Sequence, residues 1–233
     1  MEQLNNEHEF IPRMPLIGDI APQFYANTTN GKINFPNDLA GHWIVFFSHP
    51  SDFTPVCTTE FVAFQNKIAD FAEINTVLVG LSVGANASHL AWIDVIAKMK
   101  NGVQITFPLI EDLSMNVAKK YGMIHPGASD TNAVRAVFII DPSAIIRTIL
   151  YYPPVLGRNI DEIYRAVVAL QTASVFGVAT PADWTPGENV LTPAPTQVKQ
   201  LWKHDKKTPW FLNYKKLSKD DIYRKIRKQK SGK

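Results

Sequence analysis

Short apolar runs recur along the chain and predict the strands of a sheet. Residues 43–47 and 76–83 are almost entirely apolar and rich in β-branched or aromatic side chains. Continuous runs of this kind are typical of strands whose two faces are both buried. Residues 106–110 form a shorter run that contains Pro108. Because proline has no N–H to donate to a neighbouring strand, this third strand is expected near an edge of the sheet.

Two further pairs of strands are predicted by the turns between them. Asn30-Gly31 lies between β-prone runs at residues 24–29 and 32–35, and Asn-Gly strongly favours a two-residue hairpin. Asp141-Pro142-Ser143 separates residues 135–140 from residues 144–152 in a similar way. Both pairs of strands are therefore expected to be antiparallel.

Apolar residues at helical spacing predict helices between and after these strands. The first helix begins beside Cys57 and places Phe61, Phe64, Ile68 and Phe71 on one face, with Glu60 in its first turn. The other predicted helices are residues 88–100 with Ser88 as the N-cap, residues 114–121 before a C-capping Gly122, and residues 159–172.

The order of these elements predicts the fold class. Strands alternate with helices, which indicates an α/β protein whose central sheet is covered by helices. The predicted hairpins make that sheet mixed rather than all parallel. Residues 1–13 are expected to be a loose N-terminal leader, residues 14–175 the α/β domain, and residues 176–233 a C-terminal extension with a basic tail.

The C-terminal extension differs in composition from the domain before it. Prolines interrupt it, and Trp184, Trp202 and Trp210 have little regular pattern to bury them. The extension either packs as a loop-rich segment on its own domain or lies as an arm over a second subunit. We favour the arm, which makes residues 176–233 a dimerisation domain.

Charge is concentrated at the C-terminal end. Residues 199–233 carry 13 Lys or Arg and 3 Asp or Glu, whereas the whole chain has a formal charge of only +3. A basic tail raises the possibility of nucleic-acid binding. However, Ser218 begins a segment that reads as a capped helix, with Ile222 and Ile226 on one face. A solvated terminal helix is therefore favoured, and no nucleic-acid partner is expected.

Composition excludes several other classes of protein. One cysteine in 233 residues rules out an internal disulfide and a cysteine-based zinc cluster, and the six histidines show no metal-ligand spacing. The first residues are polar and acidic, unlike a signal peptide. No apolar run approaches the roughly 18 residues that a membrane helix needs. We expect a cytoplasmic protein without a membrane partner, metal or other cofactor.

The single cysteine lies where a buried strand gives way to a helix. Pro50 and Pro55 hold the connecting backbone extended, and the helix begins at or just before Cys57. Free N–H groups and the helix dipole favour an anion at such a position, so the pKa of this thiol is expected to be lowered. The alternative is a small buried side chain without a chemical role.

The sequence around Cys57 resembles a known family. Pro50-x-x-x-Thr54-x-x-Cys57 is similar to the active-site signature of the peroxiredoxins, and residues 48–60 resemble the one-cysteine, peroxiredoxin-6-like branch, with archaeal and bacterial members nearest. Further similarity lies at residues 135–141, 156–163 and 181–184. The resemblance implies a thioredoxin-like fold and a peroxidase that reduces hydrogen peroxide and organic hydroperoxides.

The same resemblance implies roles for four residues. Cys57 is the attacking thiolate, Thr54 bridges the sulfur and a peroxide oxygen, Pro50 shields the centre from water, and Arg135 stabilises the thiolate and binds the substrate. Taken one at a time, these residues also fit an ordinary turn threonine, a loop proline and an edge arginine. The joint pattern favours the catalytic interpretation.

Three more residues are expected to support this site. His49 is predicted to hydrogen-bond the thiol or the incoming peroxide, with a structural loop histidine as the alternative. Glu60 and Arg158 are predicted to pair or to hold Arg135 in place. For Arg158 a surface position is the alternative.

The cysteine count also predicts the catalytic cycle. Attack on peroxide converts Cys57 to a sulfenic acid, and no second cysteine in the chain can resolve it. An external thiol (thioredoxin, glutathione or a small thiol) is expected to do so. The resemblance implies a homodimer and makes a decameric ring plausible. Thiol–disulfide exchange, a holdase chaperone and a redox-sensing oligomer are the alternative functions.

Overall fold

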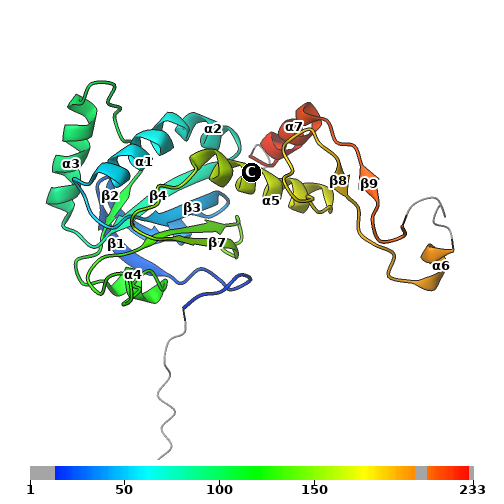
Figure 1. The fold of residues 1–233 in the computed structure, drawn as a ribbon, viewed down its shortest axis with the longest axis horizontal. Coiled ribbons are helices and arrows are strands. Elements are labelled where there is room, and N and C mark those ends of the chain that lie inside the picture. The colour runs from blue at the N-terminus through cyan, green and yellow to red at the C-terminus, as the bar shows by residue number, and fades with distance from the viewer. Residues whose placement is uncertain (1–13, 203–208, 231–233) are drawn as a thin grey trace, which may run out of the picture.

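The computed structural model describes residues 14–202 and 209–230 and contains a mixed sheet with helices on both faces (Figure 1). The seven strands of this sheet follow the order β2-β1-β5-β4-β3-β6-β7. This arrangement confirms the predicted α/β class and thioredoxin-like fold. The predicted leader, residues 1–13, lies outside the described residues. The strands are β1 (Phe24–Thr28), β2 (Gly31–Phe35), β3 (Trp43–Ser48), β4 (Thr76–Ser82), β5 (Leu109–Glu111), β6 (Arg135–Ile140) and β7 (Ile146–Tyr152).

Helices connect and cover these strands. The α-helices are α1 (Pro55–Asn66), α2 (Ile68–Glu73), α3 (Asn86–Lys98), α4 (Asn116–Lys120), α5 (Ile160–Phe176), α6 (Val198–Leu201) and α7 (Lys219–Lys230), with a short 3-10 helix at Asn37–Leu39. Within the described ranges, no helix has the length and apolar character needed to span a membrane.

Strand β3 lies inside the sheet, between β4 and β6, and is buried along its whole length. It runs parallel to β4 and antiparallel to β6. Because successive side chains of a strand point to opposite faces, Val45 and Phe47 pack with α1, α2 and α5, whereas Ile44 and Phe46 pack against α4 and the β1–β2 hairpin. The continuous apolar run at residues 43–47 is explained by these two cores.

The two predicted hairpins are confirmed, but the predicted edge strand is wrong. Strands β1 and β2 pair antiparallel, as do β6 and β7. Strand β5 lies between β1 and β4, inside the sheet. Pro108 immediately precedes this strand, and its carbonyl accepts a hydrogen bond from Gly80 at 2.9 Å. Pro108 therefore lies before the residues of β5, and its lack of an N–H removes no hydrogen bond between β5 and its neighbouring strands.

Several predicted helix limits are corrected by the structure. The first helix is interrupted at Lys67, which separates α1 from α2. Since α1 begins at Pro55, Glu60 lies in its second turn rather than its first. Helix α3 begins at Asn86, so Ser88 is not its N-cap. The Ser88 hydroxyl instead donates to the Asp52 carboxylate at 2.7 Å.

The C-terminal extension leaves the domain and returns to it (Figure 1). After α5, strand β8 (Val190–Leu191) pairs antiparallel with the returning strand β9 (Tyr214–Lys215), and α6 lies between them in the chain. Helix α7 then packs against α5. The predicted terminal helix is thus present, but its apolar face is buried rather than fully solvated.

The three tryptophans of the extension have different surroundings. Trp184 is fully buried against its own chain, whereas 79% of Trp202 and 48% of Trp210 is exposed. The extension is therefore partly packed on its own domain and partly left with exposed aromatic surface. The predicted division of the chain at residues 175 and 176 remains a prediction.

The packing of α7 leads to a stability prediction. Ile222 is fully buried in the core that α5 and α7 share. Ile222→Ala is expected to lower the free energy of unfolding by about 2–4 kcal/mol, because it leaves a cavity. Urea unfolding measures this change. Leu90→Ala on the exposed surface of α3 is the control and should change stability by about 0.5 kcal/mol or less. Equal effects of the two variants would contradict the docking of α7.

Candidate active site

The first turn of α1 holds Cys57 beneath the surface. Thr54 is the extended N-cap residue of this helix, and Pro55 occupies its first position, where a backbone N–H would have no helical partner. The first helical hydrogen bond runs from the Thr58 N–H to the Thr54 carbonyl at 3.0 Å. The N–H groups of Val56 and Cys57 therefore precede the helical ladder and favour an anion there. Cys57 is free and fully buried.

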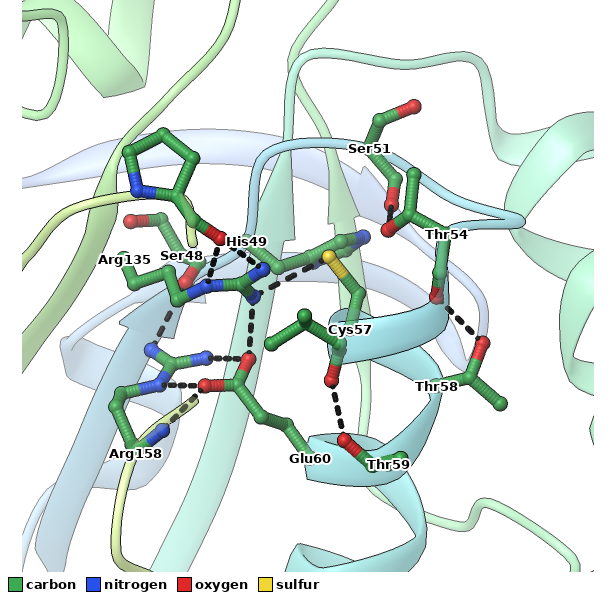
Figure 2. A network of polar contacts seen from close by, with 12 residues as sticks. Ser48, His49, Ser51, Thr54, Cys57, Thr58, Thr59, Glu60, Arg135 and Arg158 are labelled. Carbon is green, nitrogen blue, oxygen red and sulfur yellow. Dashed lines mark hydrogen bonds and ion pairs between the residues drawn. The ribbon is translucent and has the colours of Figure 1, made fainter. Parts of the chain in front are cut away.

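Arg135 brings a positive charge directly to the sulfur. Its Nη1 donates to Cys57 Sγ at 3.3 Å and to Glu60 Oε2 at 2.6 Å (Figure 2). Its Nε and Nη2 both donate to the Pro154 carbonyl, at 3.0 and 2.7 Å. The guanidinium is thus fixed from two sides, with one edge on the thiol. The sequence prediction that Arg135 lies beside Cys57 agrees with this geometry.

Arg158 holds the other side of the Glu60 carboxylate. Its Nε donates to Oε1 at 2.9 Å and its Nη2 to Oε2 at 2.8 Å. Its Nη1 donates to the carbonyls of Ser48 and Ala136, each at 2.9 Å. Burial lowers the pKa of the Arg158 guanidinium, and Glu60 opposes that shift. The side chain is fully buried, so the surface alternative for Arg158 is wrong.

The charges of this cluster do not cancel unless the thiol ionises. Two guanidinium groups, of Arg135 and Arg158, share one carboxylate of Glu60, and all three side chains are almost completely buried. The sum is one net positive charge beside the sulfur. A negative charge that develops on the Cys57 sulfur would therefore meet an unbalanced positive charge at 3.3 Å.

Thr54 and Pro50 lie in the loop before α1. The Thr54 hydroxyl donates to the Ser51 carbonyl at 2.9 Å, so its own proton is already used and its lone pairs remain available as acceptors. In Figure 2 the sulfur is directed toward the Arg135 guanidinium, and Ser51 and Thr54 lie on the loop at the other side of it. Pro50 is half-buried at the end of β3. No hydrogen bond joins Thr54 to the sulfur within the described part of the chain.

His49 has a different partner from the one predicted. Its Nε2 lies 3.0 Å from Asp52 Oδ1, rather than bonding the Cys57 thiol. The ring packs edge-on against Phe61, with centroids 4.8 Å apart, and lies 5.1 Å from the Trp92 ring. Burial lowers the pKa of His49, although Asp52 opposes the shift.

Sequence reasoning missed Asp52 and His89. Asp52 accepts hydrogen bonds from His49, from His89 Nδ1 at 2.7 Å and from the Ser88 hydroxyl. Burial alone would raise the pKa of Asp52, but these three hydrogen bonds hold it well below its ordinary value. Asp52 lies within the motif at residues 48–60, and this position in the sequence could have identified it as a site residue. His89 is 37 residues away and gave no such signal.

The described side chains were compared with the ligand sets that bind metal ions. Among the residues that the structure describes, no group of three His, Cys, Asp or Glu side chains is arranged to hold a metal ion. This observation does not test whether the protein needs a cofactor, so the expectation of no metal or cofactor stays a prediction.

Comparison with known families assigns both parts of the chain. Residues 17–149 match the AhpC/TSA family, and residues 169–205 match the C-terminal domain of 1-Cys peroxiredoxin. A peroxiredoxin of Methanosarcina mazei is 57% identical over 194 residues, which cover 81% of this chain and 88% of that protein. A peroxiredoxin of Aquifex aeolicus is 50% identical over 218 residues, which cover 88% of this chain and 98% of that protein.

Solved structures show the same relationship. The yeast mitochondrial 1-Cys peroxiredoxin superposes with a TM-score of 0.78 at 39% identity, covering 88% of this chain and all of that one. A cysteine-to-serine mutant of peroxiredoxin 6 from Arenicola marina gives a TM-score of 0.78 at 32% identity, covering 87% and 98%. At these identities the likeness extends beyond the fold to the sequence.

The shared carboxylate leads to a prediction. Glu60→Gln removes the carboxylate that the two buried guanidinium groups share, so we expect a loss of about 3–5 kcal/mol in the free energy of unfolding. Guanidinium chloride unfolding measures it. Glu162→Gln is the matched control, because Glu162 pairs with Arg165 at a partly exposed site and should cost about 1 kcal/mol or less. A Glu60→Gln variant as stable as the control would show that the two arginines do not depend on this carboxylate.

Proposed function

The chain belongs to the peroxiredoxin family as a one-cysteine member and is a thiol-dependent peroxidase, and from this we propose that Cys57 is its peroxidatic cysteine. The observation that carries the assignment is the 3.3 Å contact between Arg135 Nη1 and Cys57 Sγ, inside a buried cluster that lacks one negative charge. Cys57 is also the only cysteine in the sequence, so no other thiol competes for the role.

The reaction begins with attack of the thiolate on one peroxide oxygen. The sulfur–oxygen bond forms as the oxygen–oxygen bond breaks, and the electron pair of that bond leaves on the second oxygen. That oxygen takes a proton and departs as water from hydrogen peroxide, or as an alcohol from an alkyl hydroperoxide. Cys57 is oxidised to a sulfenic acid.

Three residues around Cys57 assist this step. The Arg135 guanidinium stabilises the thiolate and donates to the peroxide oxygen, since its planar donors can reach both. Thr54, whose hydroxyl proton is held by Ser51, offers lone pairs to the O–H of the peroxide. Pro50, which has no N–H, keeps water from the loop side of the sulfur. Their combined effect is to stabilise charge as it moves from sulfur to the leaving oxygen.

Glu60, Arg158 and His49 support these groups without bonding the sulfur. Glu60 positions Arg135, and Arg158 anchors Glu60 to the ends of β3 and β6. His49 hydrogen-bonds the peroxide. The positioning roles of Glu60 and Arg158 fit their burial, because a buried polar group that bonds only its neighbours acts through them.

An external thiol completes the cycle. A thiol attacks the sulfenic acid to form a mixed disulfide and water. A second thiol attacks that disulfide, so that the two external thiols leave as a disulfide and Cys57 is released as the thiolate. The yeast mitochondrial 1-Cys peroxiredoxin has a thiol resolving mechanism that works via the glutathione and thioredoxin systems. Glutathione, thioredoxin or a small thiol in the cytoplasm serves as the reductant of this chain. Under excess peroxide, oxidation of Cys57 continues to the sulfinic or sulfonic acid.

The C-terminal extension serves as the arm of a homodimer. The exposed apolar surface of the extension supports this role. Trp202, which follows α6, is 79% exposed, and Phe211, which precedes β9, is 60% exposed. Aromatic side chains of this kind are enriched at subunit contacts. A decameric ring of such dimers is the larger assembly. The basic tail binds no nucleic acid.

Variants of two residues test the peroxidase assignment. Cys57→Ser should abolish peroxide-dependent oxidation of the protein. Arg135→Ala should slow it by about 100-fold or more, because one charge-stabilising donor is lost. Stopped-flow fluorescence with hydrogen peroxide, and mass spectrometry of Cys57, follow the reaction.

Arg147→Ala, on an exposed arginine far from Cys57, is the control for Arg135→Ala. It should react at the wild-type rate. Two results would contradict the assignment. One is oxidation of Arg135→Ala at the wild-type rate, and the other is an oxidation rate of Cys57 that does not depend on the peroxide concentration.

A second experiment tests the arm. Trp202→Ala is expected to weaken dimerisation by about 30-fold or more, since a central aromatic anchor contributes about 2 kcal/mol or more. Analytical ultracentrifugation over a range of concentrations measures the dissociation constant. Tyr25→Ala removes an equally exposed aromatic ring from β1 and should leave it unchanged. A monomeric wild-type protein at all concentrations would exclude the arm.

A further inference from the structure

The Ser48 side chain continues the connection between β3 and β6 where their backbone pairing ends. The last pair in the register of these strands is Phe47 opposite Val137. Ser48 is the next residue of β3 and is fully buried. Its Oγ donates to the Val134 carbonyl at 2.6 Å and accepts from the Ala136 N–H at 3.1 Å. At this end of the two strands, a hydroxyl therefore provides the bonds that hold them together.

The two backbone groups that bond Ser48 lie on either side of Arg135. The Ala136 N–H also donates to the Val134 carbonyl at 3.1 Å, which closes a three-residue turn with Arg135 at its centre. A carbonyl can only accept, so the single proton of the Ser48 hydroxyl points to Val134, and one of its lone pairs receives the Ala136 N–H. Both ends of this turn are therefore held by the same oxygen atom.

Arg158 fastens the same part of the backbone from another direction. Its Nη1 donates to the carbonyls of Ser48 and Ala136, each at 2.9 Å. Its Nη2 donates to the Glu60 carboxylate, which also accepts from Arg135. Figure 2 shows Ser48 beside both arginine side chains. One continuous network of hydrogen bonds therefore restrains both the backbone and the guanidinium of Arg135.

The position of the Arg135 backbone decides whether its guanidinium reaches the sulfur. Nη1 lies 3.3 Å from Cys57 Sγ, and a hydrogen bond weakens steeply when it bends. The side chain is long, so a small rotation at its Cα moves the guanidinium by a larger distance. A misplacement of about 1 Å can lower a rate by about 100-fold. Glu60 and the Pro154 carbonyl restrain the tip of this side chain, whereas Ser48 restrains its base.

The hydroxyl of Ser48 ends a strand that is otherwise apolar. Residues 43–47 are all apolar and buried. A buried hydroxyl costs free energy unless it is hydrogen-bonded, and an apolar side chain would bury surface without that cost. Ser48 uses both its proton and a lone pair on the backbone groups that flank Arg135. Its contribution is therefore to the geometry of this turn.

We propose that Ser48 is a positioning residue of the peroxidase, whose hydroxyl holds the turn at Arg135 so that Nη1 faces the Cys57 sulfur. Within the described ranges the Ser48 hydroxyl bonds only the two backbone groups that flank Arg135. It therefore acts through Arg135 and touches neither the sulfur nor the peroxide. This inference rests on the proposed roles of Cys57 and Arg135.

A double-mutant cycle on the full chain tests this dependence. Ser48→Ala should slow oxidation by hydrogen peroxide about tenfold or more, measured by stopped-flow fluorescence, because it releases the base of the Arg135 side chain. In an Arg135→Ala background the same substitution should change the rate by less than about twofold, because the residue through which it acts is already absent.

Thr172→Val is the matched control for Ser48→Ala. It removes a fully buried hydroxyl that donates to a backbone carbonyl, that of Val168 on α5, at 2.7 Å. It should leave the oxidation rate unchanged in both backgrounds. A general loss of buried hydrogen bonding is thereby separated from an effect on Arg135.

Exchange of the Arg135 Nε–H proton with water gives a readout that needs no peroxide. This N–H donates to the Pro154 carbonyl at 3.0 Å and belongs to a buried side chain, so nitrogen-15 NMR of wild type should show slow exchange. Ser48→Ala should accelerate the exchange about fivefold or more, as loss of one hydrogen bond predicts, whereas Thr172→Val should not. The signal is assigned by its absence from the Arg135→Ala spectrum.

Two results would overturn the proposal. One is a wild-type oxidation rate in folded Ser48→Ala, and the other is equal slowing by Ser48→Ala with and without Arg135. If Ser48→Ala does not fold, Ser48→Thr takes its place. Ser48→Thr keeps the hydroxyl and suits a strand, so it should react within about threefold of wild type. A folded Ser48→Thr that reacts as slowly as Arg135→Ala would contradict the proposal equally.

Failure of the proposed function gives a different result. If Cys57→Ser and wild type respond alike to peroxide, the role of Cys57 fails. The exchange of the Arg135 Nε–H then still decides whether Ser48 positions this side chain, and unchanged exchange in Ser48→Ala would exclude it.

Discussion

The buried carboxylate of Glu60 is the contact on which the site depends. Without it, two buried guanidinium groups would lie beside each other and beside a cysteine with no carboxylate between them. With it, Arg135 and Arg158 each find a counter-charge, and the cluster retains a single positive charge directed at the sulfur. An interior ion pair of this kind contributes little net stability. In this site the ion pairs hold the Arg135 guanidinium in a fixed position and leave one positive charge of the cluster unneutralised.

The sheet determines where this cluster forms. Strand β6 is antiparallel to β3, so the start of β6 lies beside the end of β3. The Ser48 hydroxyl connects the two ends, since it donates to the Val134 carbonyl at 2.6 Å and accepts from the Ala136 N–H at 3.1 Å. Arg135 opens one strand, and the loop to Cys57 leaves the other. A charge and a thiol that are 78 residues apart thereby come into contact.

Much of this could be predicted from the sequence, because the signals were local. The apolar run before Cys57, the Asn30-Gly31 turn and the proline pattern describe short segments whose geometry neighbouring residues control. The errors involve information that lies elsewhere. No break in apolar spacing announces the end of α1 near Lys67, and the interior position of β5 depends on strands distant in sequence. The Asp52–His89 contact was missed because its partners meet only after α3 docks.

The C-terminal extension is tethered at both ends. It leaves through α5 and returns through β9 to α7, which is anchored on α5 by buried isoleucines. A segment closed in this way explores a much smaller volume than a free tail of equal length, so its conformational entropy is already reduced before any neighbour arrives. Ordering a segment that is anchored at both ends therefore costs less free energy than ordering a free tail of equal length.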